Sequence, residues 1–92
     1  MLEIAYSSQF RKDFKKIRKS GRYDLNQLEG IVDKLSEEKP LGAKHRNHAL
    51  KGELSGFHEC HICPDWLLIY KIDRQTNHLR LARTGSHSEL FD

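Results

Sequence analysis

The sequence predicts one α+β domain over residues 1–92, with a short N-terminal strand, an antiparallel pair of helices, a meander of three or four strands and a short C-terminal helix. Three observations support this fold class. Apolar residues have helical spacing between residues 8 and 40. They alternate or run together, as in strands, between residues 57 and 83. With 92 residues, the chain can form one small core but not two domains.

The N-terminal residues predict a strand followed by a helix. Residues 2–6 alternate between apolar and other side chains, which is the period of a short strand. The next apolar side chains share one helical stripe: Phe10, Phe14 and Ile17. Ser7 or Ser8 can cap the start of this helix, and Gly21 can end it in a left-handed conformation.

A second helix is expected after Asp24, because Gln27 three residues later completes a capping-box pattern. Its apolar stripe consists of Leu25, Leu28, Ile31, Val32 and Leu35. Pro40 is expected to end the helix, since proline disfavours helical geometry in the residue before it. About three residues join the two helices, so they should form an antiparallel hairpin.

The second half of the chain predicts strands. Residues 41–56 have the composition of a loop with one short strand at residues 48–50. Three further strands are separated by polar turns: residues 57–63, 66–72 and 78–83. On the last strand, alternation places three side chains on one face: Leu79, Leu81 and Arg83. Residues 86–89 form a capping-box pattern that opens the final helix.

The positive charge is concentrated in one segment. Residues 11–22 contain seven basic residues and one acidic residue, whereas the other 80 residues carry a net charge of −3. A cluster of this kind suits a polyanion such as RNA or DNA, although a solvated helix face is the alternative. The candidate polyanion-binding side chains are Arg11, Lys12, Lys15, Lys16, Arg18 and Lys19. We expect them to lie away from the edge of the sheet at which the histidine candidates described below converge.

Several classes of protein are excluded by composition. The longest apolar run, residues 66–70, is far shorter than the roughly 20 residues of a membrane span. The N-terminus lacks the basic and then apolar pattern of a signal peptide, so we expect a cytoplasmic protein without a membrane partner. Two cysteines do not form a disulfide framework.

Histidine is the first candidate for a functional residue, with six in the chain. Its side chain can accept and donate a proton near neutral pH. Five residues at strand ends and connections could converge at one edge of the sheet: His48, His61, Asp65, Arg83 and His87. Any one of these histidines could equally be an ordinary surface or core residue.

Two further motifs have structural alternatives. Residues 84–86 precede a helix, where backbone N–H groups can bind phosphate, or where they can form an ordinary cap. Cys60 and Cys63 form a Cys-x-x-Cys pattern, but on a regular strand they point to opposite faces. We therefore expect two buried or half-buried thiols, with neither a metal site nor a cofactor.

The sequence resembles the YafQ-like branch of the RelE/ParE superfamily of bacterial toxins. The segments that carry the resemblance are residues 48–52, 56–61, 64–71, 83–87 and 90–91. The resemblance implies a curved, mainly antiparallel sheet with the helical hairpin on one side. It also implies a metal-independent endoribonuclease that cleaves mRNA on the ribosome, by attack of the 2′-hydroxyl to give a 2′,3′-cyclic phosphate.

The resemblance also implies roles for individual residues. The proton-handling group is His48, His61, Asp65 and His87. We expect His87 to act as general acid and either His48 or Asp65 to act as general base, with His61 in support. Arg83 would hold the phosphate, and Trp66 and Phe91 would position RNA bases.

The same resemblance implies a cognate antitoxin, in a heterotetramer or a larger complex that binds operator DNA through the antitoxin. The ribosome and mRNA are the other expected partners. Two alternatives remain: a ParE-like gyrase inhibitor without catalysis, and a nucleic-acid-binding module that uses only the basic helix.

Overall fold

The computed structural model describes residues 1–91 and contains one five-stranded sheet with helices on one side and at its edge. The elements in chain order are β1 (Glu3–Tyr6), α1 (Ser8–Ser20), α2 (Leu25–Ser36), the short 3-10 helix η1 (Ala43–His45), β2 (His48–Ala49), the 3-10 helix η2 (Gly52–Leu54), β3 (His58–Cys63), β4 (Trp66–Asp73), β5 (His78–Gly85) and α3 (His87–Phe91).

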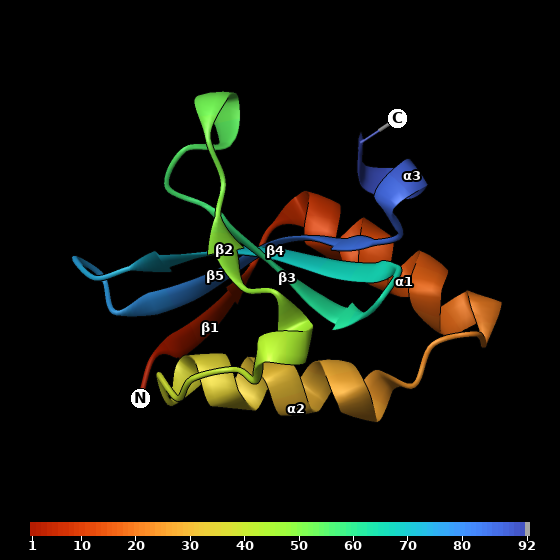
Figure 1. The fold of residues 1–92 in the computed structure, drawn as a ribbon, viewed down its shortest axis with the longest axis horizontal. Coiled ribbons are helices and arrows are strands. Elements are labelled where there is room, and N and C mark those ends of the chain that lie inside the picture. Colours follow the sequence, from red (N-terminus) through yellow and green to blue (C-terminus); the bar gives the residue numbers. More distant parts are fainter. Residues whose placement is uncertain (92) are drawn as a thin grey trace.

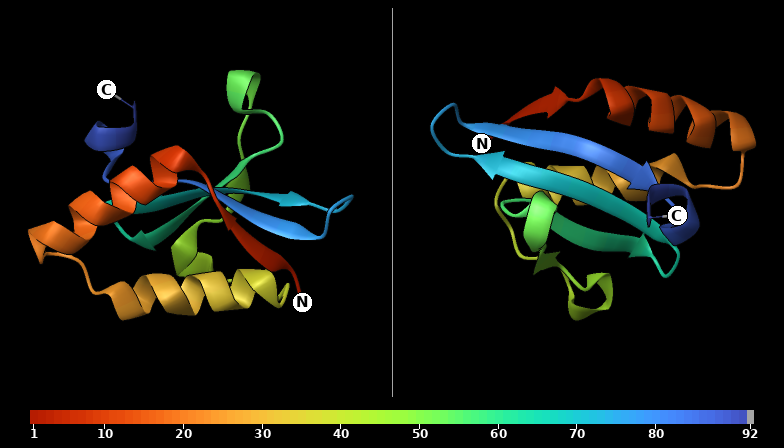
Figure 2. Two further views of the ribbon diagram at one scale, coloured as in Figure 1. Left: turned by 180° about the vertical axis from the view of Figure 1, so that it is seen from behind. Right: turned by 90° about the horizontal axis from the view of Figure 1, so that it is seen from above.

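The strands lie in the order β1-β5-β4-β3-β2. Only β1 pairs in parallel, with β5, and the other pairs are antiparallel. Helix α2 covers one face of the sheet, and α1 runs beside β5 (Figure 1 and Figure 2). Over residues 1–91, the opposite face carries no long helix, and α3 and the η2 segment lie at its margins, as the right view of Figure 2 shows. We call it the uncovered face, although the side chains of Leu67 and Ile69 on it are buried. The predicted α+β fold class is therefore confirmed.

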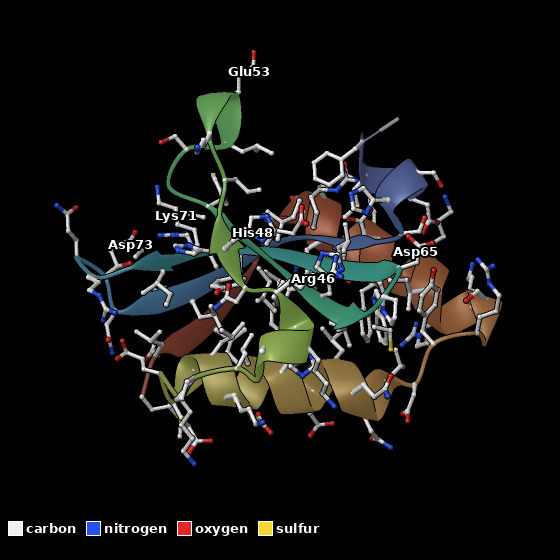
Figure 3. All side chains as sticks on the ribbon, in the orientation of Figure 1. Arg46, His48, Glu53, Asp65, Lys71 and Asp73 are labelled. Atoms are coloured by element: carbon white, nitrogen blue, oxygen red, sulfur yellow. The ribbon has the colours of Figure 1, made fainter. Side chains whose placement is uncertain are left out.

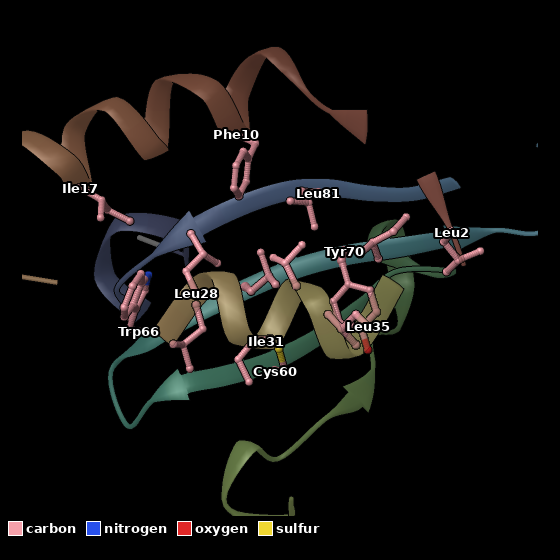
Figure 4. Packing of buried hydrophobic residues seen from close by; sticks show 14 residues of the cluster. Leu2, Phe10, Ile17, Leu28, Ile31, Leu35, Cys60, Trp66, Tyr70 and Leu81 are labelled. Atoms are coloured by element: carbon pink, nitrogen blue, oxygen red, sulfur yellow. The ribbon is translucent and has the colours of Figure 1, made fainter. Parts of the chain in front are cut away.

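The hydrophobic core lies between the helices and one face of the sheet (Figure 4). Helix α1 contributes the buried Phe10 and Ile17, which belong to its predicted stripe. Helix α2 contributes Leu28, Ile31, Val32 and Leu35. The strands contribute Cys60, Ile62, Trp66, Leu68, Tyr70, Leu79 and Leu81. Burial of these side chains fixes which face of the sheet is left for function.

The ends of the two long helices depend on local capping. Ser7, not Ser8, caps α1 and accepts a hydrogen bond from the backbone of Phe10. Gly21 ends α1 with a φ of 69°, as expected for a left-handed cap. Asp24 caps α2 as predicted and accepts a hydrogen bond from the backbone N–H of Asn26. The expected capping box with Gln27 is wrong, because the Gln27 side chain instead accepts a hydrogen bond from Sγ of Cys63.

The expectation that Pro40 ends α2 is wrong. The helix ends at Ser36, and Glu38 then adopts a φ of 57°. The N–H of Glu38 donates to the carbonyl of Leu35, and the N–H of Lys39 donates to the carbonyl of Lys34. This is the hydrogen-bond pattern of a Schellman motif, so α2 ends through its own C-terminal cap.

A β-bulge overturns the expected orientation of Arg83. Tyr70 pairs with Leu81, whereas the adjacent Ile69 pairs with Arg83, so Ala82 is an extra residue in β5. Directly paired residues project from the same face, and Ile69 and Tyr70 project from opposite faces. Arg83 therefore leaves the core face of Leu81 and joins the uncovered face.

A second register shift changes the orientation of Cys63. Cys60 pairs with Leu68, and Cys63 pairs with Trp66, with the irregularity between His61 and Cys63. Both cysteines consequently lie on the core face rather than on opposite faces. They are free thiols, with Cys60 buried and Cys63 half-buried, as expected.

The burial of Cys60 predicts a loss of stability at high pH. Burial, with a smaller contribution from the charge of Glu59, raises the pKa of the Cys60 thiol from 9.0 to about 12. Because the folded pKa is raised, this group does not change the free energy of unfolding below pH 9, but it lowers that free energy as the pH rises from 9 toward 12. We expect Cys60→Ala to flatten this decline, measured by urea unfolding at several pH values.

Cys63→Ala is the matched control and should retain the wild-type decline. Burial also raises the pKa of Tyr70 to about 12, so some alkaline destabilisation should remain in the Cys60 variant. An unchanged slope in Cys60→Ala would contradict the prediction.

Candidate active site

The uncovered face of the sheet brings four residues into one row across four strands. His48 on β2 pairs with Glu59 on β3, Glu59 pairs with Ile69 on β4, and Ile69 pairs with Arg83 on β5. Neighbouring strands are about 4.8 Å apart, so this row extends over roughly 15 Å. The row places an imidazole at one end and a guanidinium at the other.

The next row along the strands contains His61, Leu67 and Gly85. Gly85 has a φ of 156°, and a Cβ atom there would lie 3.2 Å from Oε1 of Glu89. Glycine at this position therefore allows α3 to fold back over the end of the sheet. Figure 3 shows His48 on β2, Arg46 at the end of η1 just before β2, and Asp65 at the β3–β4 turn, near α3.

Glu59 is a site residue that the sequence analysis missed. Only 5% of it is exposed. Its Oε1 atom lies 3.4 Å from Nε2 of His61 and 3.9 Å from Nε2 of His48. The sequence holds a signal for this pairing, because alternation along the predicted strand 57–63 places Glu59 and His61 on one face. The structure thus assembles a carboxylate between two of the predicted histidines.

Backbone carbonyls fix the tautomers of these two histidines. Nδ1 of His48 lies 2.7 Å from the carbonyl oxygen of Arg46, and Nδ1 of His61 lies 3.2 Å from that of Pro64. A carbonyl oxygen only accepts hydrogen bonds, so each Nδ1 carries a proton. In the neutral ring, Nε2 is then free to accept a proton, and in both rings it faces Glu59.

His87 lies in the first turn of α3, with an exposed side chain. Its ring centroid lies 6.2 Å from that of His61 and 5.5 Å from that of Phe91. Its backbone N–H donates to Oδ1 of Asp65 over 3.2 Å. The contact of Asp65 is therefore with the backbone of α3, and through it Asp65 positions His87.

The motif at residues 84–86 is a helix cap rather than an anion site. Ser86 and Glu89 exchange the two hydrogen bonds of a capping box, at 2.8 Å and 3.2 Å. The N–H of Thr84 donates to Asp13. These N–H groups are thus already bound to carboxylate or hydroxyl oxygens, which leaves them unavailable to a phosphate.

Arg83 forms a two-pronged ion pair with Asp13 of α1. Nε donates to Oδ2 over 2.7 Å, and Nη2 donates to Oδ1 over 3.1 Å. Hydrogen bonding to Asp13 raises the pKa of Arg83 above its ordinary value, so the guanidinium stays charged. One third of the Arg83 side chain remains exposed on the site face.

Trp66 does not have the expected role in positioning bases. Only 2% of it is exposed, its Nε1 donates to Oγ1 of Thr84 over 2.9 Å, and its ring packs on Tyr23. A buried ring cannot stack on a nucleotide, so Trp66 supports the core under β5. Phe91 is 44% exposed beside His87 and remains available to RNA.

The basic helix is closer to the site than expected. Nζ of Lys16 lies 3.7 Å from Oε2 of Glu89, and helical spacing places Lys12 and Lys19 on the same side. The other three candidates line a groove of about 790 Å³ between α1, α2 and β1: Arg11, Lys15 and Arg18. The six cations therefore form two separate stripes, one of which borders the site.

Further cations on the site face were also missed by the sequence analysis. Lys71 pairs with Arg80 in the row next to that of Arg83, on the same face. Nζ of Lys71 lies over the Phe57 ring, and Arg80 is paired with Asp73. Strand alternation from Ile69 would have predicted the orientation of Lys71.

Within residues 1–91, no three His, Cys, Asp or Glu side chains are placed to hold a metal ion. None of the helices in this part of the chain is long and apolar enough to cross a membrane.

The sheet and its helical hairpin are those of a known class of bacterial toxins, since YafQ from E. coli strain BL21(DE3) has the same fold with a TM-score of 0.89. A family model described as "Bacterial toxin of type II toxin-antitoxin system, YafQ" matches residues 2–92. The chain belongs to this family, which confirms the resemblance drawn from the sequence.

Individual relatives support the assignment. The mRNA interferase toxin YafQ of Escherichia coli strain K12 is 39% identical over 90 residues, which cover 97% of this chain and 95% of that protein. A metal-bound toxin from Helicobacter pylori has 50% identity and a TM-score of 0.92, with coverage of 99% and 100%. YafQ in the E. coli DinJ–YafQ complex has 38% identity and a TM-score of 0.88, with full coverage of both chains.

Proposed function

We propose that this protein is the toxin of a type II toxin–antitoxin pair and a ribosome-dependent endoribonuclease that cleaves mRNA. The observation that carries the proposal is the row of His48, Glu59 and Arg83 on the uncovered face, with His87 beside it. The name of the E. coli relative, an mRNA interferase, supports the same activity.

The reaction needs a base, an acid and a cation. Nε2 of His48 takes the proton of the 2′-hydroxyl, the 2′-oxygen bonds to phosphorus, and the bond from phosphorus to the 5′-oxygen breaks. His87 gives its proton to the departing 5′-oxygen. Arg83 stabilises the negative charge that develops on the phosphate oxygens. The products are a 2′,3′-cyclic phosphate and a 5′-hydroxyl, and no step requires a metal.

The remaining site residues position these groups. Glu59 and His61 adjoin His48, and Asp65 holds the first turn of α3. The exposed ring of Phe91 is the candidate to position a base near the cut.

The partners follow from the charged surfaces and the relatives. The stripe of Lys12, Lys16 and Lys19 borders the site and is suited to contact ribosomal RNA. The E. coli relative is known in complex with DinJ, which supports a cognate antitoxin for this chain. We propose a heterotetramer or larger complex, in the cytoplasm, that reaches operator DNA through the antitoxin.

The test is cleavage of a defined mRNA by the purified protein with and without ribosomes. We expect cuts only with ribosomes, because an open sheet face cannot hold a flexible strand for in-line attack, and positioning of this kind is worth several kcal/mol. The 3′ ends should be 2′,3′-cyclic phosphates, and a chelator of transition metals that leaves the ribosomal magnesium in place should not slow the reaction.

Equally fast cleavage of free mRNA would contradict the dependence on the ribosome. Loss of cleavage on chelation would contradict the metal-independent mechanism. Inhibition of DNA gyrase without any RNA cleavage would instead favour the ParE-like alternative.

A further inference from the structure

Asp13 is the one acidic residue in the basic segment 11–22. On an ordinary basic helix, this carboxylate would pair with a lysine three or four residues away. Lys16 occupies such a position, yet it lies against Glu89 instead. Only 11% of the Asp13 side chain is exposed, because it turns toward β5.

The Asp13 carboxylate accepts four hydrogen bonds, which is its full capacity. Two come from Nε and Nη2 of Arg83, at 2.7 Å and 3.1 Å. The backbone N–H of Thr84 adds a third at 3.2 Å, and Nε2 of Gln9 adds a fourth at 3.3 Å. A carboxylate held in this way has one fixed orientation.

The start of α1 also holds the β-bulge that turns Arg83 toward the site. Oγ of Ser7 donates to the carbonyl of Ala82 over 2.8 Å, and the N–H of Ser7 donates to the carbonyl of Leu81 over 3.0 Å. Helix α1 therefore fixes both the backbone of Arg83 and the end of its side chain.

We propose that Asp13 is the positioning residue for Arg83, holding the Nε–Nη2 edge of the guanidinium so that its Nη1 amino group faces the scissile phosphate. An arginine held along one edge loses little conformational freedom when the phosphate arrives. Asp13 touches neither substrate nor reacting atoms and acts through Arg83. This role rests on the proposed function.

The test is single-turnover cleavage of ribosome-bound mRNA by Asp13→Asn, which keeps the shape of the side chain and removes its charge. We expect the rate at saturating ribosome to fall about ten- to a hundredfold, with little change in the ribosome concentration that gives half the maximal rate. Asp33→Asn makes the same charge change at an exposed position of α2 and should retain the wild-type rate.

An unchanged rate in Asp13→Asn would overturn the proposal. A faster rate would also overturn it, since Asp13 would then compete with the phosphate for Arg83. If the wild type cleaves nothing, the proposed function fails, whereas an active wild type with an equally active Asp13→Asn contradicts only the positioning role.

A second measurement separates positioning from stability. In an Arg83→Ala background, Asp13→Asn should cause no further loss of rate, because the guanidinium through which Asp13 acts is absent. The same loss in both backgrounds would show that Asp13 acts through the fold.

The contact itself can be observed by NMR. In the wild type, the Nε–H of Arg83 should exchange slowly with solvent, and fast exchange would overturn the proposed contact.

Discussion

Replacing His87 by alanine is expected to reduce mRNA cleavage about 10²- to 10⁴-fold, which is the usual contribution of one general acid or base. The stability of the fold should change little. The His87 side chain is exposed, and the contact that anchors α3 to Asp65 uses the backbone N–H, which alanine retains. The measurements are the single-turnover rate on ribosome-bound mRNA and the melting temperature.

Ser88→Ala is the matched control, because Ser88 is exposed in the same turn of α3 and should keep full activity. Binding of the cognate antitoxin, measured by co-purification, should survive in both variants. If His87→Ala lowered the melting temperature in proportion to the cleavage rate, His87 would be a structural residue. Another group would then have to be the general acid.

Local patterns predicted the elements of the fold because local interactions form them. The apolar stripes of α1 and α2, the cap at Asp24 and the left-handed end at Gly21 all depend on residues within one or two turns. The same holds for the capping box of Ser86 and Glu89. Each feature places its donor and acceptor within a few positions of each other in the sequence.

The β-bulge at Ala82 could not be predicted from local patterns, because a distant contact holds it. The bulge at Ala82 depends on Ser7, 75 residues earlier, and it alone brings Arg83 to the site face. Alternation without a bulge places Arg83 in the core beside Leu81. The sequence therefore predicted the right residue for the site with the wrong orientation on its strand.

The burial of individual side chains was the other property that could not be predicted from the sequence. Trp66 has the side chain of a base-stacking residue, but β4 is covered at that position, and its indole instead bonds to Thr84. Asp13 and Glu59 show the opposite error, because they were not expected to belong to the site. Each resembles a solvated surface charge in the sequence, and each is held in the structure against a cation or an imidazole.

Glu59→Gln is expected to lower the cleavage rate about ten- to a hundredfold without a loss of stability. When His48 accepts the 2′-proton, its Nε2 atom becomes positive 3.9 Å from Oε1 of Glu59. Charges at this separation interact by a few kcal/mol near a protein surface, and 1.36 kcal/mol corresponds to a factor of about ten in rate. Glutamine keeps the shape of the side chain but removes this stabilisation.

The effect on stability should have the opposite sign to the effect on rate. A carboxylate that is only 5% exposed is costly to bury. Glu59→Gln should therefore keep or raise the free energy of unfolding, measured with urea. Glu53→Gln in η2 is the control, because Glu53 is exposed and its loss should change neither quantity. If Glu59→Gln lowered stability and activity by the same proportion, the result would contradict a catalytic role for the Glu59 charge. If Glu59→Gln kept the wild-type rate, the result would show that the histidines do not need this charge.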